Sequence, residues 1–317
     1  MDYTIGAAII TKNHQNFIED SVESLLDQTR KVDHIVIHDD ASSDKTLQII
    51  SKYSHLKNIT IISNNVSVGP GKASNNALSR VGTDFVLYTS GDDISFPNRA
   101  EHQTNFLLEK NFSCVISSVD LLVSNEYAGT FDLPRFYHSN KLGDQLWLEL
   151  FWKQNFLNAS AACFKFNDNF KSLFNSDLLH LQDFELWLSL ARENTIISDE
   201  TKVLNYRISR NSLSQRVNRN EMNDRIDMEN ELFSILFNQL LIFSKLQLEL
   251  LFKDFISKFT KHIDDISLVD IPKNYLIMFL LLSHNNPSVV EKAKLTLTKS
   301  GDYKDFVHKI RTYLRVL

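Results

Sequence analysis

Two adjacent carboxylates, Asp92 and Asp93, follow a glycine at the end of an apolar run of strand length. Oxygen ligands of this kind suit a hard cation, because Mg²⁺ and Mn²⁺ are commonly held by one or two carboxylates together with substrate phosphates. Acidic pairs are also common in solvated turns and at helix N-termini, so the pair alone leaves both interpretations open. Asp92 and Asp93 are therefore candidate metal ligands.

A second acidic pair, Asp39 and Asp40, ends another short apolar run. A carboxylate at this place can accept the ring N–H of uracil, thymine or guanine, so the contact does not choose among these bases. Asp40 could equally cap the helix that is expected to follow.

A polar turn that carries glycines and Lys72 occupies residues 64–76. Its backbone N–H groups, together with Lys72, could meet a diphosphate. The GxxxxGK[ST] pattern of a P-loop is absent, and a plain helix start explains the same turn.

Asp183 begins an amphipathic stretch beside Phe184 and Trp187. A partly desolvated carboxylate there could act as a general base, although a helix N-terminus also favours negative charge for purely structural reasons. Arg207 ends a later apolar run. It could clamp a phosphate or an acceptor, or it could be an ordinary surface arginine.

The elements that must position these residues alternate between two periodicities in the first third of the chain. Strands are predicted at residues 4–10, 34–37, 59–62 and 84–88, and helices at 16–28, around Leu47 to Tyr53 after a cap at Ser42 or Ser43, at 69–81 and from 97 to 108. Strands separated by helices of this length predict βαβ units and a mostly parallel sheet. Ligands bind beyond the carboxyl ends of such strands, where the polar tips gather.

The rest of the chain changes character in two steps. A mixed region contains predicted strands at 113–123 and 195–206 and predicted helices at 146–156 and 183–191, and from about 217 glycine vanishes until Gly301. There Leu232, Leu236, Leu240 and Phe243 form a helical stripe that Ile235, Leu241 and Leu246 widen, which indicates burial on more than one side. We predict a domain at 1–215 and a helical region at 216–317. This region packs on the first domain, forms a homo-oligomer or contacts a membrane surface.

Composition narrows the class of protein. The chain has 317 residues, 43% hydrophobic and 23% charged, as in a globular protein, and its net charge of -5 argues against nucleic acid as a partner. Cys114 and Cys163 lie in apolar surroundings without zinc spacing, which predicts free thiols in a reducing cytoplasm. No signal-peptide pattern is present, and the longest apolar run, 275–282, is shorter than the ~20 residues that span a bilayer. A cytoplasmic protein is expected, with peripheral contact at the inner face of the membrane left open.

Four stretches in a fixed order resemble the family 2 glycosyltransferases of GT-A fold: IITKNHQNFIEDSVESLLDQT, HIVIHDDASSDKTLQII, GKASNNALSRVGTDFVLYTSGDDISFP and QDFELWLSLA. The resemblance is strong over residues 5–107 and stays in register to about 214. It implies a Rossmann-like α/β fold, a mostly parallel sheet flanked by helices, here followed by a C-terminal α-helical appendage.

The resemblance also implies roles on the donor side. Thr11 and Asn13 fall where the first strand meets the nucleotide, Asp40 falls on the residue that binds the base, and Lys72 lies near the basic position of the donor helix.

The family's Asp-x-Asp metal motif reads Ser90-Gly91-Asp92-Asp93 here. Asp92 matches the acid that touches the metal, with Asp93 beside it, and Ser90 replaces the first acid while keeping a hydroxyl for the ribose. Asp183 matches the catalytic base, and Arg207 matches the arginine of a Tyr-Arg-x-His stretch. In that stretch Ser209 replaces the histidine that could serve as a third ligand.

The implied activity is inverting transfer of a sugar from a nucleotide-diphosphate donor, a UDP-sugar, to a hydroxyl of a glycan or lipid-linked glycan in polysaccharide biosynthesis. Asp183 is the expected general base, and Mn²⁺ or Mg²⁺ at Asp92 is the expected cofactor. A non-catalytic nucleotide-sugar-binding or scaffold protein that acts through its helical tail is the alternative. A nucleotidyltransferase is a further rival, but its glycine-rich basic signature near the N-terminus is missing.

Overall fold

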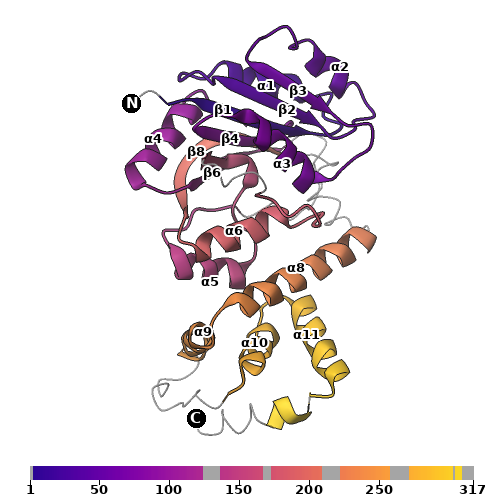
Figure 1. Cartoon of the computed structure of the whole chain (residues 1–317), viewed down its shortest axis with the longest axis vertical. Coiled ribbons are helices and arrows are strands. Elements are labelled where there is room, and N and C mark those ends of the chain that lie inside the picture. The colour runs from indigo at the N-terminus through magenta and orange to yellow at the C-terminus, as the bar shows by residue number, and fades with distance from the viewer. Residues whose placement is uncertain are drawn as a thin grey trace. The chain divides into compact units, whose positions relative to one another are not determined.

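The computed structural model describes residues 3–123, 136–166, 173–208, 222–257, 271–302 and 304–308. The chain divides into two compact units, residues 1–150 with 154–221 and residues 151–153 with 222–317 (Figure 1). The predicted domain boundary at 215–216 lies outside the described residues and stays a prediction.

The first unit is built on an eight-stranded sheet in the order β3-β2-β1-β4-β7-β6-β8-β5. Its strands are β1 Ile5–Thr11, β2 His34–Asp39, β3 Ile59–Ser63, β4 Phe85–Ser90, β5 Ile94–Ser95, β6 Cys114–Val123, β7 Ala162–Lys165 and β8 Ile196–Ile208. The pairs among β1 to β4 are parallel, β7 runs antiparallel to both of its neighbours, and β6 and β8 are parallel. The predicted α/β sheet flanked by helices is confirmed.

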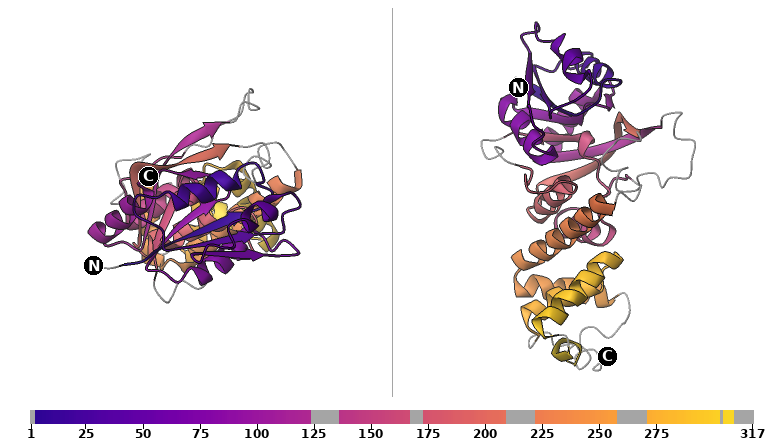
Figure 2. Two further views of the ribbon diagram at one scale, coloured as in Figure 1. Left: turned by 90° about the horizontal axis from the view of Figure 1, so that it is seen from above. Right: turned by 90° about the vertical axis from the view of Figure 1, so that its right-hand side faces the viewer.

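Helices cover both faces of this sheet (Figures 1 and 2). They are α1 Ile18–Leu26, α2 Thr46–Ser51, α3 Pro70–Val81, α4 Arg99–Lys110, α5 Gly143–Lys153 and α6 Gln182–Arg192. Alternate strand residues such as Ile9 and Ile37 join Val22 and Leu25 of α1 in one buried cluster, whereas α3 packs on the opposite face of β1 and β2. Burial of both faces explains why these strands read as continuous apolar runs.

The strand β1 lies where the order of the sheet reverses. It pairs with β2 on one side and β4 on the other, so that Thr11 stands beside Asp39 and Ile10 beside Ser90. The loops that leave β1 and β4 therefore diverge at their carboxyl ends, which is the place where open α/β sheets bind ligands. The sequence pattern located this edge correctly.

Two short strands and one helix cap were not anticipated. The strands β5 and β7 have two and four residues, too few for a periodic signal. The backbone N–H of Thr46 at the start of α2 donates to Asp44, not to Ser42 or Ser43. Cys114 and Cys163 are both buried and free, as expected.

The second unit is helical in its described parts. It contains α8 Met222–Ile242, α9 Lys245–Ser257, α10 Lys273–Leu282 and α11 Pro287–Ser300. The predicted stripe is buried, and so is Ile235, but Leu241 is 46% and Leu246 is 66% exposed. The apolar surface around the bend between α8 and α9 is therefore wider than this unit covers by itself.

One bent pair of helices in the described ranges has the length and composition of a membrane-spanning segment. No single helix there is both long and apolar enough to cross a bilayer. The pair Asn223–Ile242 and Lys245–Lys253, bent by 116°, meets those length and composition requirements only when its two helices are taken together.

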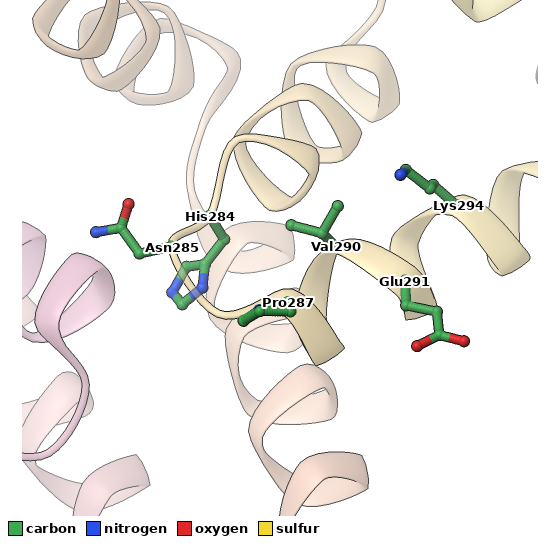
Figure 3. A pocket seen from close by; sticks show the side chains of 6 residues that line it. All are labelled: His284, Asn285, Pro287, Val290, Glu291 and Lys294. Atoms are coloured by element: carbon green, nitrogen blue, oxygen red, sulfur yellow. The ribbon is translucent and has the colours of Figure 1, made fainter.

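A shallow pocket of the second unit lies between the start of α11 and the turn before it (Figure 3). The imidazole of His284 is fully committed within the protein, because Nε2 donates to the Phe151 carbonyl at 2.6 Å and Nδ1 accepts from the Asn286 backbone at 3.0 Å. Burial lowers the pKa of His284, which keeps it neutral. This histidine therefore serves the packing of the helices. The pocket is lined by His284, Asn285, Pro287, Val290, Glu291 and Lys294.

Candidate active site

The loop after β4 holds Asp92 at the edge of the sheet. Asp92 is 6% exposed, and its Oδ1 accepts a hydrogen bond from the Ser90 hydroxyl. Gly91 allows this loop to pack on β1, since a Cβ there would stand 2.5 Å from Thr11 Oγ1 and 2.8 Å from Ile18 Cδ1. The serine that replaces an expected acid thus orients its neighbour's carboxylate and adds no further negative charge.

Asp93 occupies a deeper and less satisfied position. It is 1% exposed, and Oδ1 accepts from the Arg207 backbone N–H at 2.8 Å, while Oδ2 has no hydrogen-bond partner among the described residues. Burial, and then the charge of Asp92, raise the pKa of Asp93 well above its usual value, and interactions with Ser160, the Arg207 backbone and Arg99 partly offset this. Arg99 itself donates to Gln103, Ser95 and the carbonyls of Tyr88 and Ala162.

Arg207 ties the end of β8 to the acidic loop. Its Nε donates to the Asp92 carbonyl at 2.9 Å, and its guanidinium lies 4.4 Å from the centroid of the Phe17 ring and 3.7 Å from Asp20 Oδ2. The side chain is therefore placed by contacts with two segments of the protein, the loop after β4 and the start of α1. A phosphate-clamping role for it stays a prediction.

His14 faces Asp92 across the edge of the sheet. Its Nε2 lies 3.8 Å from Asp92 Oδ2, and its Nδ1 lies 3.2 Å from Thr11 Oγ1. The backbone is fixed on both sides, because the His14 N–H donates to Thr46 Oγ1 and its carbonyl accepts from Phe17. Thr11, predicted to meet the nucleotide, is 1% exposed and orients this imidazole.

Asp40 is the best-satisfied acid of the site. Its two oxygens accept from the Asn64 amide, the Ser67 hydroxyl and the backbone N–H groups of Val68 and Gly69. Burial alone would raise the pKa of Asp40, but these hydrogen bonds outweigh it and hold the pKa below its usual value. Two N–H groups of the turn that could meet a diphosphate are therefore engaged by this carboxylate. The base-binding role of Asp40 stays a prediction.

Asn13 joins two loops on the donor side. It adopts a left-handed φ of 57°, which asparagine tolerates, and its Oδ1 accepts from the Ser43 N–H at 2.8 Å. Its own N–H donates to the Ser42 hydroxyl. Lys72 lies exposed in the first turn of α3, and Lys12 donates to Ser67 beside Asp40. The structure thus gives Asn13 a bracing function in addition to its predicted one.

Asp183 stands in the first turn of α6, as predicted. Its Oδ2 accepts from the Asn155 amide at 2.9 Å, and its Oδ1 accepts from the Phe184 backbone. Burial raises the pKa of Asp183 to about 6. Burial also raises the pKa of Tyr88 to about 12, and the charge of Asp183 adds to that shift.

Backbone hydrogen bonds join the ends of β1, β2 and β4, which carry Thr11, Asp40 and the acidic loop. The Asp40 N–H donates to the Thr11 carbonyl, and the Gly91 N–H donates to the Ile10 carbonyl. Sequence reasoning missed His14, Tyr88 and Asn155. Only His14 carried a usable signal, since it directly follows Thr11-Lys12-Asn13, whereas Asn155 joins the site through the fold alone.

The residues present fit a divalent cation at Asp92. A carboxylate oxygen and an imidazole nitrogen face each other there, and Asp93 holds a buried oxygen without a hydrogen-bond partner in the described ranges. Within the same ranges no three His, Cys, Asp or Glu side chains gather in a metal-ligand arrangement. A cation would thus need oxygen atoms from a ligand, as Mg²⁺ sites that bind through substrate phosphates do.

The family model described as glycosyl transferase family 2 matches residues 7–169, about half of the chain and most of the site described above. The chain belongs to glycosyltransferase family 2.

Two glycosyltransferases are similar in sequence to this chain over most of their own length. The chain is 26% identical over 217 residues to UDP-Glc:alpha-D-GlcNAc-diphosphoundecaprenol beta-1,3-glucosyltransferase WfgD of Escherichia coli, covering 67% of this chain and 80% of that protein. It is 25% identical over 207 residues to the putative teichuronic acid biosynthesis glycosyltransferase TuaG of Bacillus subtilis (strain 168), covering 64% and 78%.

Among solved structures, the crystal structure of S. aureus TarS 1-349 in complex with UDP is similar with a TM-score of 0.57. The match has 16% sequence identity and covers 88% of this chain and 79% of that chain. At this identity the likeness shows the fold, which is the GT-A fold of the glycosyltransferase.

Proposed function

We propose that this family 2 glycosyltransferase transfers a sugar from a UDP-sugar to a hydroxyl of a lipid-linked or free glycan, with inversion at the anomeric carbon. The observation that carries the proposal is the state of Asp183. Burial raises the pKa of its carboxyl to about 6, and the Asn155 amide holds its Oδ2 by a hydrogen bond of 2.9 Å. A base of this pKa is largely ionised at neutral pH and still accepts a proton readily.

The donor half of the proposal follows from the edge of the sheet. Asp40 and the loop that it holds form the side where the base would lie, and Ser90 offers a hydroxyl near the ribose. Asp92, with Asp93 beside it, would hold Mn²⁺ or Mg²⁺, which supplies positive charge to the diphosphate leaving group. Lys72 and Arg207 are the cations that the proposal assigns to the diphosphate. The UDP in the TarS complex and the UDP-Glc in the name of WfgD support uridine as the base.

The acceptor half depends on Asp183. We infer that its carboxylate takes the proton of the attacking hydroxyl, which bonds to the anomeric carbon as the bond to the diphosphate oxygen breaks on the opposite face. Asn155 orients the carboxylate by its hydrogen bond to Oδ2. One displacement inverts the anomeric centre without a covalent intermediate. The diphosphoundecaprenol in the name of WfgD makes a lipid diphosphate sugar the first acceptor to test.

The test is a donor and acceptor screen with purified full-length protein. UDP-glucose and UDP-GlcNAc are offered with Mn²⁺ and a short-chain lipid diphosphate GlcNAc, and UDP release and product are followed by mass spectrometry and anomeric NMR. We expect UDP release with an inverted product. Release of pyrophosphate would instead indicate a nucleotidyltransferase, and UDP binding without turnover of any donor would favour the non-catalytic alternative.

A further inference from the structure

One imidazole faces Asp92, the acid proposed above to bind the metal. His14 lies in the loop after β1, and its Nε2 stands 3.8 Å from Asp92 Oδ2. This separation is longer than a hydrogen bond, so the two groups face each other without being joined. Two adjacent donors on one octahedral cation, with bonds of about 2.1 Å, lie about 3.0 Å apart. The two side chains would therefore approach each other by somewhat less than ~1 Å to share one cation.

The orientation of the ring supports the same role. Nδ1 of His14 lies 3.2 Å from Thr11 Oγ1, and a proton on Nδ1 that donates to this hydroxyl leaves the lone pair of Nε2 directed at Asp92. A second hydrogen bond of this kind typically fixes the tautomer and the orientation of metal-binding histidines. Thr11 is 1% exposed, so its hydroxyl is held in place by the core.

The carboxylate is oriented from its other side. Ser90 donates to Asp92 Oδ1, which leaves Oδ2 as the oxygen that faces the imidazole. Gly91 brings the two loops together, because any side chain there would collide with Thr11. The side chains of His14 and Asp92 are 20% and 8% exposed, so the space between them remains open to a small ligand on one side.

From these contacts we propose that His14 is a ligand of the divalent cation, which it binds through Nε2 together with Asp92 Oδ2. The inference rests on the metal-dependent donor binding proposed above. It assigns the nitrogen ligand to the loop after β1, whereas the family stretch near Arg207 has Ser209 where a histidine would stand. A nitrogen ligand favours Mn²⁺ over Mg²⁺, because imidazole suits transition metals better than the harder Mg²⁺.

The decisive measurement is pulsed EPR of Mn²⁺ bound to the full-length protein with UDP. Wild type should show electron spin-echo modulation from one directly bound ¹⁴N nucleus, and His14→Gln should lose it. His55→Gln is the matched control, since His55 belongs to the same unit, lies exposed and contacts only its own turn in the described structure. We expect this control to keep the nitrogen signal. Persistence of the signal in His14→Gln, or its absence from wild-type protein that binds Mn²⁺ and UDP, overturns the inference.

Calorimetry adds a second readout that a merely structural histidine would not move. In the presence of UDP, His14→Gln should weaken Mn²⁺ at least ~10-fold and Mg²⁺ by a smaller factor, so that the ratio of the two affinities falls. An equal loss for both ions assigns His14 to the folding of the loop and overturns the inference. If His14→Gln does not fold, Thr11→Val, which removes only the hydroxyl beside Nδ1, should lower the same ratio. Wild-type protein that binds no Mn²⁺ with UDP contradicts the proposed function itself.

Discussion

The two acidic pairs, Asp39-Asp40 and Asp92-Asp93, look alike in the sequence and differ in the folded protein. Both lie at the ends of strands of the same sheet, but Asp40 accepts four hydrogen bonds and has a lowered pKa, whereas Asp93 has a raised pKa and an oxygen without a hydrogen-bond partner among the described residues. Hydrogen bonds therefore stabilise the charged form of Asp40. The charged form of Asp93 is destabilised by burial and by Asp92, and a cation bound as proposed would lower that cost.

The largest effect is expected from Asp92→Asn. If Asp92 holds the cation as proposed, its loss removes several kcal/mol of charge stabilisation from the leaving diphosphate, so turnover should fall by about 10³-fold. Titration of Mn²⁺ into the assay should no longer change the rate. If the variant keeps the Mn²⁺ dependence of the wild type, Asp92 is not the metal ligand and the proposed difference between the two pairs is wrong.

Asp183→Asn tests a half-buried acid whose two oxygens are hydrogen-bonded but whose pKa is raised, as that of Asp93 is. Turnover should fall by at least ~10²-fold while affinity for UDP stays unchanged. Because the pKa of Asp183 is raised to about 6, the base is protonated below that pH, and the rate of the wild type should rise with pH through about 6. Glu185→Gln, two residues along α6, is the matched control and should keep both the rate and the pH profile. Full activity of Asp183→Asn means that another group is the base.

Asp40→Asn tests how much the hydrogen-bonded Asp40 carboxylate contributes to the free energy of unfolding. The amide would turn an N–H group toward donors that now bond to the carboxylate, and we expect a loss of about 1–3 kcal/mol in the free energy of unfolding. Since folding lowers the pKa of Asp40, its contribution is present above the unfolded-state pKa and is lost as the pH falls through the folded-state pKa. Thermal melting at pH 7 and at acidic pH should show the gap between variant and wild type closing. A constant gap would assign the loss to another cause.

The smallest effect is expected from Asp93→Asn. The amide carbonyl can still accept from the Arg207 backbone, so the loop should keep its shape, and Mn²⁺ affinity with UDP should change by only about threefold if Asp92 is the principal ligand. Calorimetry beside Asp92→Asn measures the difference. An equal loss in the two variants would make both carboxylates equal ligands.

The sequence predicted the parallel half of the fold well because the physical signal there is strong. Strands buried on both faces read as apolar runs, and Gly82, with a φ of 67°, ends α3 where the pattern predicted. The short strands β5 and β7 escaped because a few residues carry no period. The stripe was predicted too wide, since Leu241 of α8 is exposed and Leu246 lies exposed on α9, after the end of that helix.

The site was predictable as a set of acids but not as an arrangement. Adjacent carboxylates at strand ends marked Asp40 and Asp92, yet nothing in the sequence distinguished a saturated carboxylate from an unsaturated one. That difference arises from the loop at 64–69, which folds onto Asp40, and from the meeting of His14 with Asp92 across the sheet. Both the hydrogen bonding of Asp40 and the position of His14 depend on contacts between distant segments, which local sequence patterns do not encode.

The hydrogen bonds of Asn13 limit which substitutions the loop after β1 can accept. The Asn13 N–H donates to Ser42, and the Asn13 side chain accepts from the Ser43 N–H. The Gln15 N–H donates to Asp44, and the Gln15 side chain accepts from the Lys45 N–H. Four hydrogen bonds therefore join two loops that are distant in the sequence. A substitution in either loop disturbs the other. We therefore expect changes of donor preference, in evolution or in directed selection, to arise either as paired substitutions in these two loops or as substitutions outside them.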